Sequence, residues 1–550
     1  MGVVAQQNFH QGLVKTHLVR FIPTRFGLPC LLAAISLLVG SCTSVAPTLS
    51  VNIDSTQPPA APREFRAMWI ATVANIDWPS RAGLSTAEQQ QEIRKIVATA
   101  KRLKMNALIL QVRPAADALY TSATEPWSEY LSGVQGQAPQ PFYDPLSAWI
   151  NEAHAHGIEL HAWFNPYRAR HSAAKSSPAA NHLINTRPDL VKTYGEQRWI
   201  DPGEADAAKR LIDVVRDVVR RYDVDGVHID DYFYPYPVKA VAPVVTVTAT
   251  NVEPTEVDFP DDPSWRRYVA IGGKLNRADW RRDNVNRLVQ ALNPAIHGEK
   301  TWVKFGISPF GLPRPDRRPE GITGFSQYDK LYADVELWWS QGWLDYLAPQ
   351  LYWPIAQTAQ SFPVLLDYWS RANSKKRHLW PGVFTSKIDE SDASWKPDEI
   401  RQQIELLRND TGTSGHIHFS AVSLTQNRRG LADALAQTTY GIDALVPATP
   451  WLRPNTAALV PAPVATLRCA MNAEGRASGS CRVEVSNAAK TEGFTWAIWT
   501  KYGTTWQFSV ATAASMLLPE QAAGQALRQV VISRVDRYGV EGERSLLARS

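Results

Sequence analysis

The chain has 550 residues, of which 44% are hydrophobic and 20% are charged. This composition is typical of a globular protein with room for two domains. The formal net charge of +5 falls to about +2 without the three cations of residues 1–42. A balance this close to neutral gives no indication of nucleic acid or another polyanion as a partner.

Residues 1–42 have the pattern of a secretory signal. Lys15, Arg20 and Arg25 precede an apolar run, residues 28–39, which ends in small residues before Cys42. A basic region followed by a short apolar segment is typical of a secretory signal. The run is too short to span a bilayer.

Val39-Gly40-Ser41-Cys42 resembles the box of a bacterial lipoprotein, in which the cysteine is lipidated and becomes the new N-terminus. Ordinary cleavage nearby, with Cys42 incidental, is the alternative. Thr43 is not acidic, which is typical of lipoproteins sorted to the outer membrane of Gram-negative bacteria. We therefore expect an outer-membrane lipoprotein that faces the periplasm, with the lipid anchor as its membrane contact.

Residues 43–62 are rich in Pro, Ala, Ser and Thr, and we expect them to form a disordered tether. From residue 63 to about 440, strand and helix patterns alternate eight times, which predicts a (β/α)8 TIM barrel. A doubly wound open sheet is the alternative. The predicted strands are 66–73, 107–114, 158–165, 224–230, 303–309, 345–352, 378–384 and 416–420. The predicted helices are 86–104, 145–156, 205–221, 279–292, 327–341, 362–371, 397–408 and 429–436.

Side chains alternate between the two faces of each predicted strand. In most strands one face is apolar, and polar residues collect on the other face toward the strand's C-terminal end. On the eighth strand this pattern places His416, His418 and Ser420 on the inner face. Active sites of this fold lie at the C-terminal ends of the strands, so a polar opening there predicts a binding site.

After residue 440 the character of the sequence changes. A Pro-rich linker, residues 441–464, precedes short alternating strands over 465–550, which predict a small β-sandwich similar to fibronectin type III. Cys469 and Cys481 are the only cysteines beyond Cys42. An exported compartment permits a disulfide between them, with unpaired buried thiols as the alternative. No cysteine lies in the barrel region, which argues against thiol catalysis.

Residues 224–235, Val-Asp-Gly-Val-His-Ile-Asp-Asp-Tyr-Phe-Tyr-Pro, predict a short buried strand that ends in two adjacent carboxylates. Asp230 is expected to point into the barrel and is the first candidate for acid, base or nucleophile chemistry; a structural ion pair is the alternative. Asp231 turns into the opening if the strand breaks there, or else caps the loop. Two close carboxylates raise one pKa, as a general acid requires. The adjacent pair also suits a substrate-assisted mechanism on N-acetyl sugars.

A second carboxylate from the loops would serve conventional acid and base chemistry. The candidates, which the sequence does not rank, are Asp77, Glu125, Glu129 and Asp201.

Aromatic and polar residues collect at or just beyond the predicted strand ends. Aromatic faces pack on the C–H faces of sugar rings, while polar side chains bind the hydroxyls. Each residue alone could equally be structural, but together they indicate a sugar site. The predicted substrate-binding residues are Trp69, Arg113, His161, Trp163, Asn165, Tyr167, Arg168, His228, Tyr232, Gln350, Tyr352, Trp353 and His418.

Two other functions stay open at this point. A metal-dependent deacetylase or amidohydrolase would need His161, His228, Asp230, His416 and His418 to converge. Barrel amidohydrolases carry His-X-His on the first strand, whereas here it lies on the eighth, so we expect no metal and no other cofactor. A non-catalytic glycan-binding lipoprotein could use the same opening.

Several motifs together resemble the bacterial glycosyl hydrolase-like ten family over about residues 63–440. They are Arg63–Val73, Gln111–Pro114, Ala162–Arg168, His228–Pro235 and Tyr346–Trp353. The resemblance implies a (β/α)8 lipoprotein. In one branch of the family, which acts in cell division, it implies cleavage of peptidoglycan glycan strands stripped of their peptides. The expected partner is thus the glycan strand, and the sequence names no protein partner.

Overall fold

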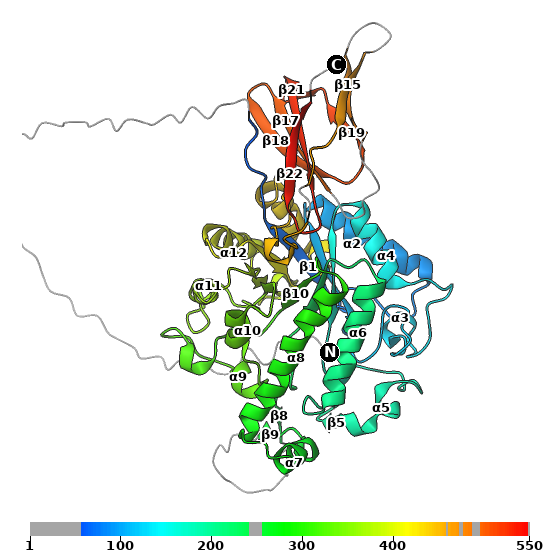
Figure 1. Cartoon of the computed structure of the whole chain (residues 1–550), viewed down its shortest axis with the longest axis vertical. Helices are drawn as coiled ribbons and strands as arrows, with labels where there is room; N and C mark the ends of the chain where they lie inside the picture. The colour runs from blue at the N-terminus through cyan, green and yellow to red at the C-terminus, as the bar shows by residue number, and fades with distance from the viewer. Residues whose placement is uncertain (1–56, 241–255, 458–459, 472–476, 487–494, 548–550) are drawn as a thin grey trace, which may run out of the picture. The chain divides into compact units, whose positions relative to one another are not determined.

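The computed structural model describes residues 57–240, 256–457, 460–471, 477–486 and 495–547 (Figure 1). The predicted signal, Cys42 and residues 43–56 of the predicted tether lie outside these residues. Within the described ranges, no helix is both long and apolar enough to cross a membrane.

A parallel sheet closed into a barrel forms the larger part of the structure. Its strands run in the order β12-β11-β10-β7-β3-β2-β1-β14-β13. The bounds are β1 Phe65–Ile70, β2 Ala107–Arg113, β3 Glu159–Phe164, β7 Gly226–Ile229, β10 Lys304–Ile307, β11 Tyr346–Leu347, β12 His378–Leu379, β13 Gly382–Val383 and β14 Gly415–His418. The predicted (β/α)8 barrel is confirmed.

The barrel closes through its seventh strand, which is interrupted by Trp380 and Pro381. The first half, β12, pairs with β11, and the second half, β13, pairs with β14. Proline has no backbone N–H and cannot continue a hydrogen-bonded ladder, which explains the break. The two halves therefore act as one strand, and eight parallel strands form the ring.

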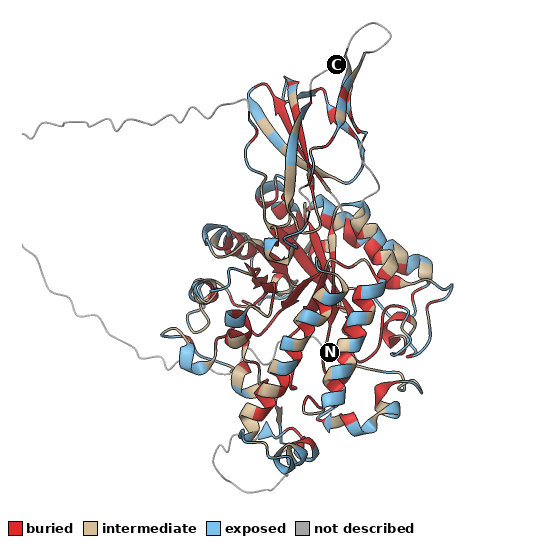
Figure 2. Ribbon diagram, viewed as in Figure 1, coloured by how far each residue is buried: buried red, intermediate tan, exposed pale blue. Residues whose placement is uncertain are grey.

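Helices cover the outer face of this sheet, as Figure 1 shows for α6 and α8, which lie side by side. Their bounds are α2 Thr86–Arg102, α4 Pro145–Ala155, α6 Ala205–Arg221, α8 Arg277–Glu299, α10 Val335–Gln341, α11 Phe362–Arg371, α12 Pro397–Asn409, α13 Ala421–Thr425 and α14 Leu431–Ala434. In α6, Leu211, Val214 and Val218 recur at helical spacing and are buried, while the opposite face is charged. Figure 2 shows the same striping on each long helix.

Local sequence signals set several helix ends. At the start of α2, the Ser85 side chain accepts from the Glu88 N–H, while the Glu88 carboxylate accepts from the Ser85 N–H. This reciprocal capping box satisfies two N–H groups that have no partner inside the helix. The helix predicted over residues 327–341 is instead two helices, α9 Gln327–Lys330 and α10. Tyr332 between them has a φ of +54°, which no helix tolerates.

Long connections at the C-terminal ends of three strands carry small elements of their own. The loop after β2 holds α3 Glu129–Ser132. The loop after β3 holds a three-stranded sheet of β4 Arg168–Arg170, β5 Val191–Tyr194 and β6 Gln197–Ile200, together with α5 Leu183–Thr186. The loop after β7 holds β8 Val238–Lys239, β9 Glu256–Val257 and α7 Asp262–Ala270.

The C-terminal residues form two facing antiparallel sheets around an apolar core. One sheet is β15-β16-β19 and the other contains β18, β17, β21, β20 and β22. The bounds are β15 Ala465–Met471, β16 Ala477–Val485, β17 Thr495–Tyr502, β18 Thr505–Ala511, β19 Ser515–Pro519, β20 Gln521–Ala522, β21 Gln525–Val535 and β22 Glu541–Leu547. A disulfide joins Cys469 and Cys481, which lie opposite each other on β15 and β16. The predicted sandwich is thus present, with β19, β20 and β22 in addition to the five predicted strands.

Candidate functional site at the barrel mouth

Aromatic rings fill the interior of the barrel. Phe65, Trp69, Trp163, Tyr346 and Trp380 pack there in one buried cluster. Two strands make room for these rings by carrying glycine on the inner face. A Cβ at Gly226 would lie 2.4 Å from His161, and one at Gly306 would lie 2.1 Å from the Tyr346 ring. No other residue fits at either position without displacing a ring.

Hydrogen bonds connect these rings to buried histidines. Trp69 donates its indole N–H to His228 Nε2 over 3.1 Å, because an indole nitrogen can only donate. Burial holds the pKa of His228 well below its usual value, so the ring is neutral and its proton is on Nδ1. Ser308 Oγ, 2.9 Å from Nε2, must then donate as well. His228 Nδ1 donates to the Tyr346 hydroxyl over 3.0 Å.

The hydrogen bonds below Tyr346 run in the same donor-to-acceptor direction, toward the floor of the barrel. The Tyr346 hydroxyl donates to His161 Nδ1 over 3.0 Å, and His161 Nε2 donates to Glu159 over 3.0 Å. Lys304 Nζ lies 2.8 Å from the Glu159 carboxylate and balances its charge. We call Trp69, His228, Tyr346, His161, Glu159 and Lys304 the interior network. It orients Trp69 and fixes both histidine tautomers.

Asp230 lies directly after β7 and points into the barrel mouth, the opening at the C-terminal ends of the strands. Its carboxylate accepts from Trp163 Nε1 over 3.0 Å and from Asn165 Nδ2 over 3.1 Å. The residue is 3% exposed. Asp230 thus has the inward placement expected from strand parity, with neutral donors rather than an arginine as its hydrogen-bond partners.

Asp231 turns toward the same opening because β7 ends at Ile229. Its carboxylate accepts from the Tyr236 hydroxyl, and a hydrogen bond from the Gln350 side chain also favours its charged form. Asp231 is as buried as Asp230. The two adjacent carboxylates therefore face the mouth on separate sets of donors.

Burial dominates the electrostatics of both groups. It raises the pKa of Asp230 to about 7, with attraction from Arg168 opposing the rise and repulsion from Asp231 adding to it. Burial also raises the pKa of Asp231 to about 6, against the hydrogen bond from Tyr236. Near neutral pH, Asp230 can hold a proton while Asp231 is charged.

Arg168 is a buried cation whose charge acts on both carboxylates. Its guanidinium lies 4.2 Å from the centre of the Tyr232 ring, and the residue is 2% exposed. Its backbone N–H donates to Asn165 Oδ1 over 2.8 Å, which fixes the amide so that its NH2 group faces Asp230. Asn165, Arg168 and Tyr232 are therefore brought together with the carboxylates, as predicted.

Stacked aromatic rings line one side of the mouth. Tyr352 packs against Phe384 at 4.8 Å and against Phe419 at 5.6 Å, and Phe419 contacts Trp69 at 6.2 Å. Trp69 and Tyr352 were predicted from the sequence, whereas Phe384 and Phe419 were not. Flat rings of this kind suit the C–H faces of a sugar.

Five predicted substrate-binding residues do not line the mouth: Arg113, His161, Tyr167, Trp353 and His418. His161 lies deeper, hydrogen-bonded between Tyr346 and Glu159. Arg113 is buried in an ion pair with Glu125 at 2.7 Å and donates to the Asn165 carbonyl. It therefore stabilises the backbone of the loop that carries Asn165. Tyr167 and Trp353 are buried in the apolar core outside the barrel.

The placement predicted for His418 is wrong. Ile417 packs inside the barrel, while His418 pairs in register with Met68 and Val383 on the outer face. There His418 and His416 both hydrogen-bond the Tyr440 hydroxyl, at 2.7 and 2.5 Å. The five groups considered as metal ligands are therefore split between the two faces of the sheet and do not converge. Among the residues with described positions, no cluster of three His, Cys, Asp or Glu side chains could hold a metal ion.

Most of the loop carboxylates serve the scaffold. Glu125 pairs with Arg113, Glu129 accepts two backbone N–H groups, and Asp201 accepts from Ser264. Asp77 accepts from Ser420 Oγ and two backbone N–H groups at the ends of β1 and β14. Burial raises its pKa to about 6. Asp77 thus shares burial and a raised pKa with the Asp230 pair.

Three polar residues of this site were not among the predicted site residues: Tyr236, Ser308 and Tyr346. Strand alternation already places Ser308 on the polar face of its predicted strand, and the same alternation could have placed Tyr346. Tyr236 follows β7 in a loop, and no periodic signal points it at Asp231.

A family model described as Glycosyl hydrolase-like 10 matches residues 64–398. The chain belongs to this family. Glycosyl hydrolase YngK of Bacillus subtilis strain 168 is 43% identical over 406 residues, which cover 72% of this chain and 75% of YngK. Glycosyl hydrolase DigH of Escherichia coli strain K12 is 31% identical over 448 residues, which cover 75% of this chain and 97% of DigH.

Solved glycoside hydrolase structures also resemble this glycosyl hydrolase-like 10 member. The PgaB (BpsB) glycoside hydrolase domain of Bordetella bronchiseptica aligns with a TM-score of 0.45 at 13% identity, covering 68% of this chain and 98% of that domain. The catalytic domain of a Paenibacillus polymyxa β-amylase aligns with a TM-score of 0.45 at 11% identity, covering 70% of this chain and 99% of that domain.

Proposed function

We propose that this protein is a glycoside hydrolase that cleaves cell-wall glycan strands, with peptide-free peptidoglycan as its substrate. The observation that carries the proposal is the buried Asp230–Asp231 pair at the barrel mouth, whose two carboxylates accept from separate sets of donors. Because burial raises the pKa of both groups, we assign the proton near neutral pH to Asp230 and the charge to Asp231. Glycoside hydrolysis requires this division of roles between an acid and a second group. Membership of the glycosyl hydrolase-like 10 family supports the same chemistry.

In the first step, Asp230 gives its proton to the leaving glycosidic oxygen as the bond from that oxygen to the anomeric carbon breaks. An N-acetyl sugar supplies the nucleophile in the substrate-assisted form of the reaction: its acetamido oxygen bonds to the anomeric carbon, and Asp231 orients the acetamido group through its N–H. In the second step, Asp230 takes a proton from water, and that water displaces the acetamido oxygen. Atoms and charge balance over the two steps, which together consume one water.

The proposed location follows from the sequence. A lipid on Cys42 would anchor the protein in the outer membrane, and residues 43–62 would let the barrel reach glycan strands in the periplasm. Glycan strands freed of peptide during cell division are the substrate that the family resemblance implies.

The proposal is tested with the mature protein on purified glycan strands, with and without their peptides. We expect new reducing ends from the peptide-free strands and products of defined length by mass spectrometry. Binding to the strands without any release of reducing ends would instead identify a non-catalytic glycan-binding protein. Deacetylated strands without chain cleavage would identify a deacetylase.

A further inference from the structure

The segment that follows β7 returns toward the catalytic pair. Tyr236 lies five residues beyond Asp231, and its hydroxyl donates to the Asp231 carboxylate. A phenol is a neutral donor, so this contact stabilises a charged carboxylate without supplying a counter-charge. Tyr236 therefore differs from Arg168, whose charge attracts both carboxylates.

Aromatic packing fixes the Tyr236 ring. It stacks on Phe325 with a centroid distance of 5.2 Å and an angle of 25° between the ring planes. Its other neighbour is Tyr232, edge-on at 5.6 Å. With the ring held on two sides, the hydroxyl has one direction available, and Asp231 lies in it.

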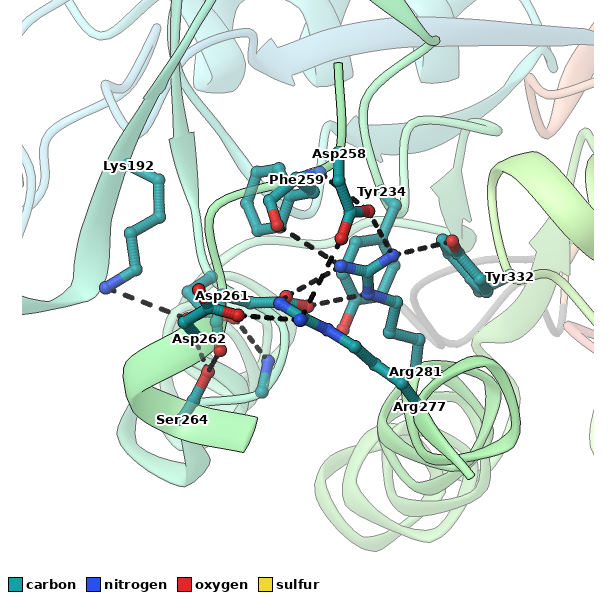
Figure 3. Close-up of polar contacts among 12 residues, drawn as sticks. Lys192, Tyr234, Asp258, Phe259, Asp261, Asp262, Ser264, Arg277, Arg281 and Tyr332 are labelled. Atoms are coloured by element: carbon teal, nitrogen blue, oxygen red, sulfur yellow. Dashed lines mark hydrogen bonds and ion pairs between the residues drawn. The ribbon is translucent and has the colours of Figure 1, made fainter. Parts of the chain in front are cut away.

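A buried arginine cluster anchors the segment further along. Arg281 of α8 donates to both oxygens of Asp261 over 2.7 Å, to Asp258 over 2.8 Å and to the Tyr332 hydroxyl over 2.7 Å (Figure 3). It also donates to the Phe259 carbonyl over 3.2 Å. Asp261 is fully buried and Arg281 almost so, which makes this a rigid attachment rather than a surface ion pair.

The attachment reaches the residues beside the catalytic pair. Phe259 packs edge-on against Tyr234 at 5.4 Å, and the Arg281 guanidinium lies 5.7 Å from the centre of the Tyr234 ring. Tyr194 of β5 connects the two strands of the segment, because its hydroxyl donates to the Val257 carbonyl and accepts from the Val238 N–H. Residues 232–238 are thus held from both ends.

We propose that Tyr236 is the positioning residue of this site: it keeps Asp231 charged and aimed into the mouth, and the cluster around Arg281 holds Tyr236 in place. The assignment deepens the proposed function, on which its catalytic part rests. Tyr236 does not touch the reacting atoms, since it acts through Asp231.

The groups that face Asp231 decide what the loss of Tyr236 would do. Asp230 precedes it, Arg168 approaches from the loop after β3, Gln350 from the loop after β11, and the phenols of Tyr232 and Tyr352 complete the surroundings. Neither charged neighbour changes in a Tyr236→Phe variant. The variant therefore removes one neutral donor, and the pKa of Asp231 must rise.

The first test is the pH dependence of glycan cleavage by Tyr236→Phe. Loss of a hydrogen bond to a charged group corresponds to about one pKa unit. We expect the acidic limb of the kcat/KM profile to move to higher pH by about one unit. At pH values below this limb kcat/KM should fall about tenfold, and above pH 8 it should change little. Tyr268→Phe is the matched control: the Tyr268 hydroxyl on α7 accepts from the backbone N–H groups of Lys274 and Leu275, which follow that helix, and the variant's profile should equal the parent's.

The second test needs no activity. Burial places the pKa of Asp231 above its unfolded value, so its ionisation destabilises the fold as pH rises through that pKa. Tyr236→Phe should therefore lower the melting temperature more at pH 8 than at pH 5. In an Asp231→Asn background, the effect of Tyr236→Phe should no longer depend on pH.

The two tests separate the possible failures. A melting-temperature difference that is the same at both pH values, or that survives in the Asp231→Asn background, would overturn the role of Tyr236. Absence of cleavage by the parent protein, with the pH-dependent melting difference present, would overturn the proposed function and support the coupling of Tyr236 to Asp231. An unmoved acidic limb in an active variant would overturn the catalytic part of the assignment.

Discussion

Replacing Asp230 by Asn removes the proposed acid while preserving the shape of the side chain. General acid catalysis contributes about 10²- to 10⁴-fold to a rate, which corresponds to about 3–5 kcal/mol of transition-state stabilisation. We expect Asp230→Asn to lose cleavage of peptide-free glycan strands by that factor. The assay is release of reducing ends, with the variant and the parent compared at equal concentration.

The same substitution has a second effect, on stability, that depends on pH. Burial raises the pKa of Asp230 from 3.8 in the unfolded chain to about 7, so ionisation of the folded protein costs ~4 kcal/mol relative to the unfolded chain. This cost is absent below pH 4, grows up to pH 7 and is constant above. Asn never ionises and escapes it. Trp163 Nε1 and Asn165 Nδ2 both donate to Asp230 Oδ2, so the amide oxygen of the Asn variant can accept both hydrogen bonds, and the substitution costs little below pH 4.

The stability curves of parent and variant should therefore diverge as pH rises. Asp230→Asn should be about as stable as the parent at pH 4 and more stable than the parent at pH 8, as measured by urea unfolding at each pH. Asp213→Asn on α6, where the carboxylate is 50% exposed, is the control and should change stability by less than about 0.5 kcal/mol. Parallel curves, or a variant that cleaves at the parental rate, would refute the burial and the catalytic role assigned to Asp230.

Three further predictions concern other parts of the site. The pH profile of the parent's kcat/KM should be bell-shaped, with an acidic limb near pH 6 for Asp231 and a basic limb near pH 7 for Asp230, because the acid must be protonated and its partner charged. Activity that rises steadily to pH 9 would contradict these roles. Arg281→Gln should lower the free energy of unfolding in urea by about 3 kcal/mol, because buried Asp261 loses its main counter-charge; a change below about 0.5 kcal/mol would contradict the cluster. His418→Asn should lower the melting temperature but leave KM unchanged, since His418 lies outside the barrel; a raised KM at unchanged melting temperature would place it in the mouth.

The barrel was predictable because its signals are redundant. Each strand carries buried β-branched or aromatic residues between helical stretches, and eight repeats allow few other folds. The helix ends were less predictable. The helix predicted over residues 279–292 stops short of Pro294, yet α8 continues through this proline to Glu299. The turn beyond the proline buries Ile296 and places His297 3.0 Å from Asp345, and this packing outweighs the missing backbone hydrogen bond.

The catalytic pair was predictable and its surroundings only partly so. Asp230 follows a strand whose alternation of inward and outward residues is clear. Its donors Trp163 and Asn165 have the spacing of inward positions along the predicted strand 158–165, which lies beside it in the sheet. The prediction of the inner face of the eighth strand was wrong because both faces of a parallel strand are buried, so polar residues do not mark the inner face. There the polar face meets Tyr440, a partner 22 residues further along that no local pattern reveals.

The interior network has a consequence for how this protein can change. Between Trp69 and Lys304, each histidine accepts at one ring nitrogen and donates at the other, and the Tyr346 hydroxyl does both. Altering one member therefore leaves a buried neighbour without its hydrogen-bond partner. Substitutions there must come in compensating pairs, whereas the loops around the opening can vary one residue at a time. New substrate preferences in such proteins should therefore arise from substitutions in the loops around the opening, while the residues of the interior network stay the same.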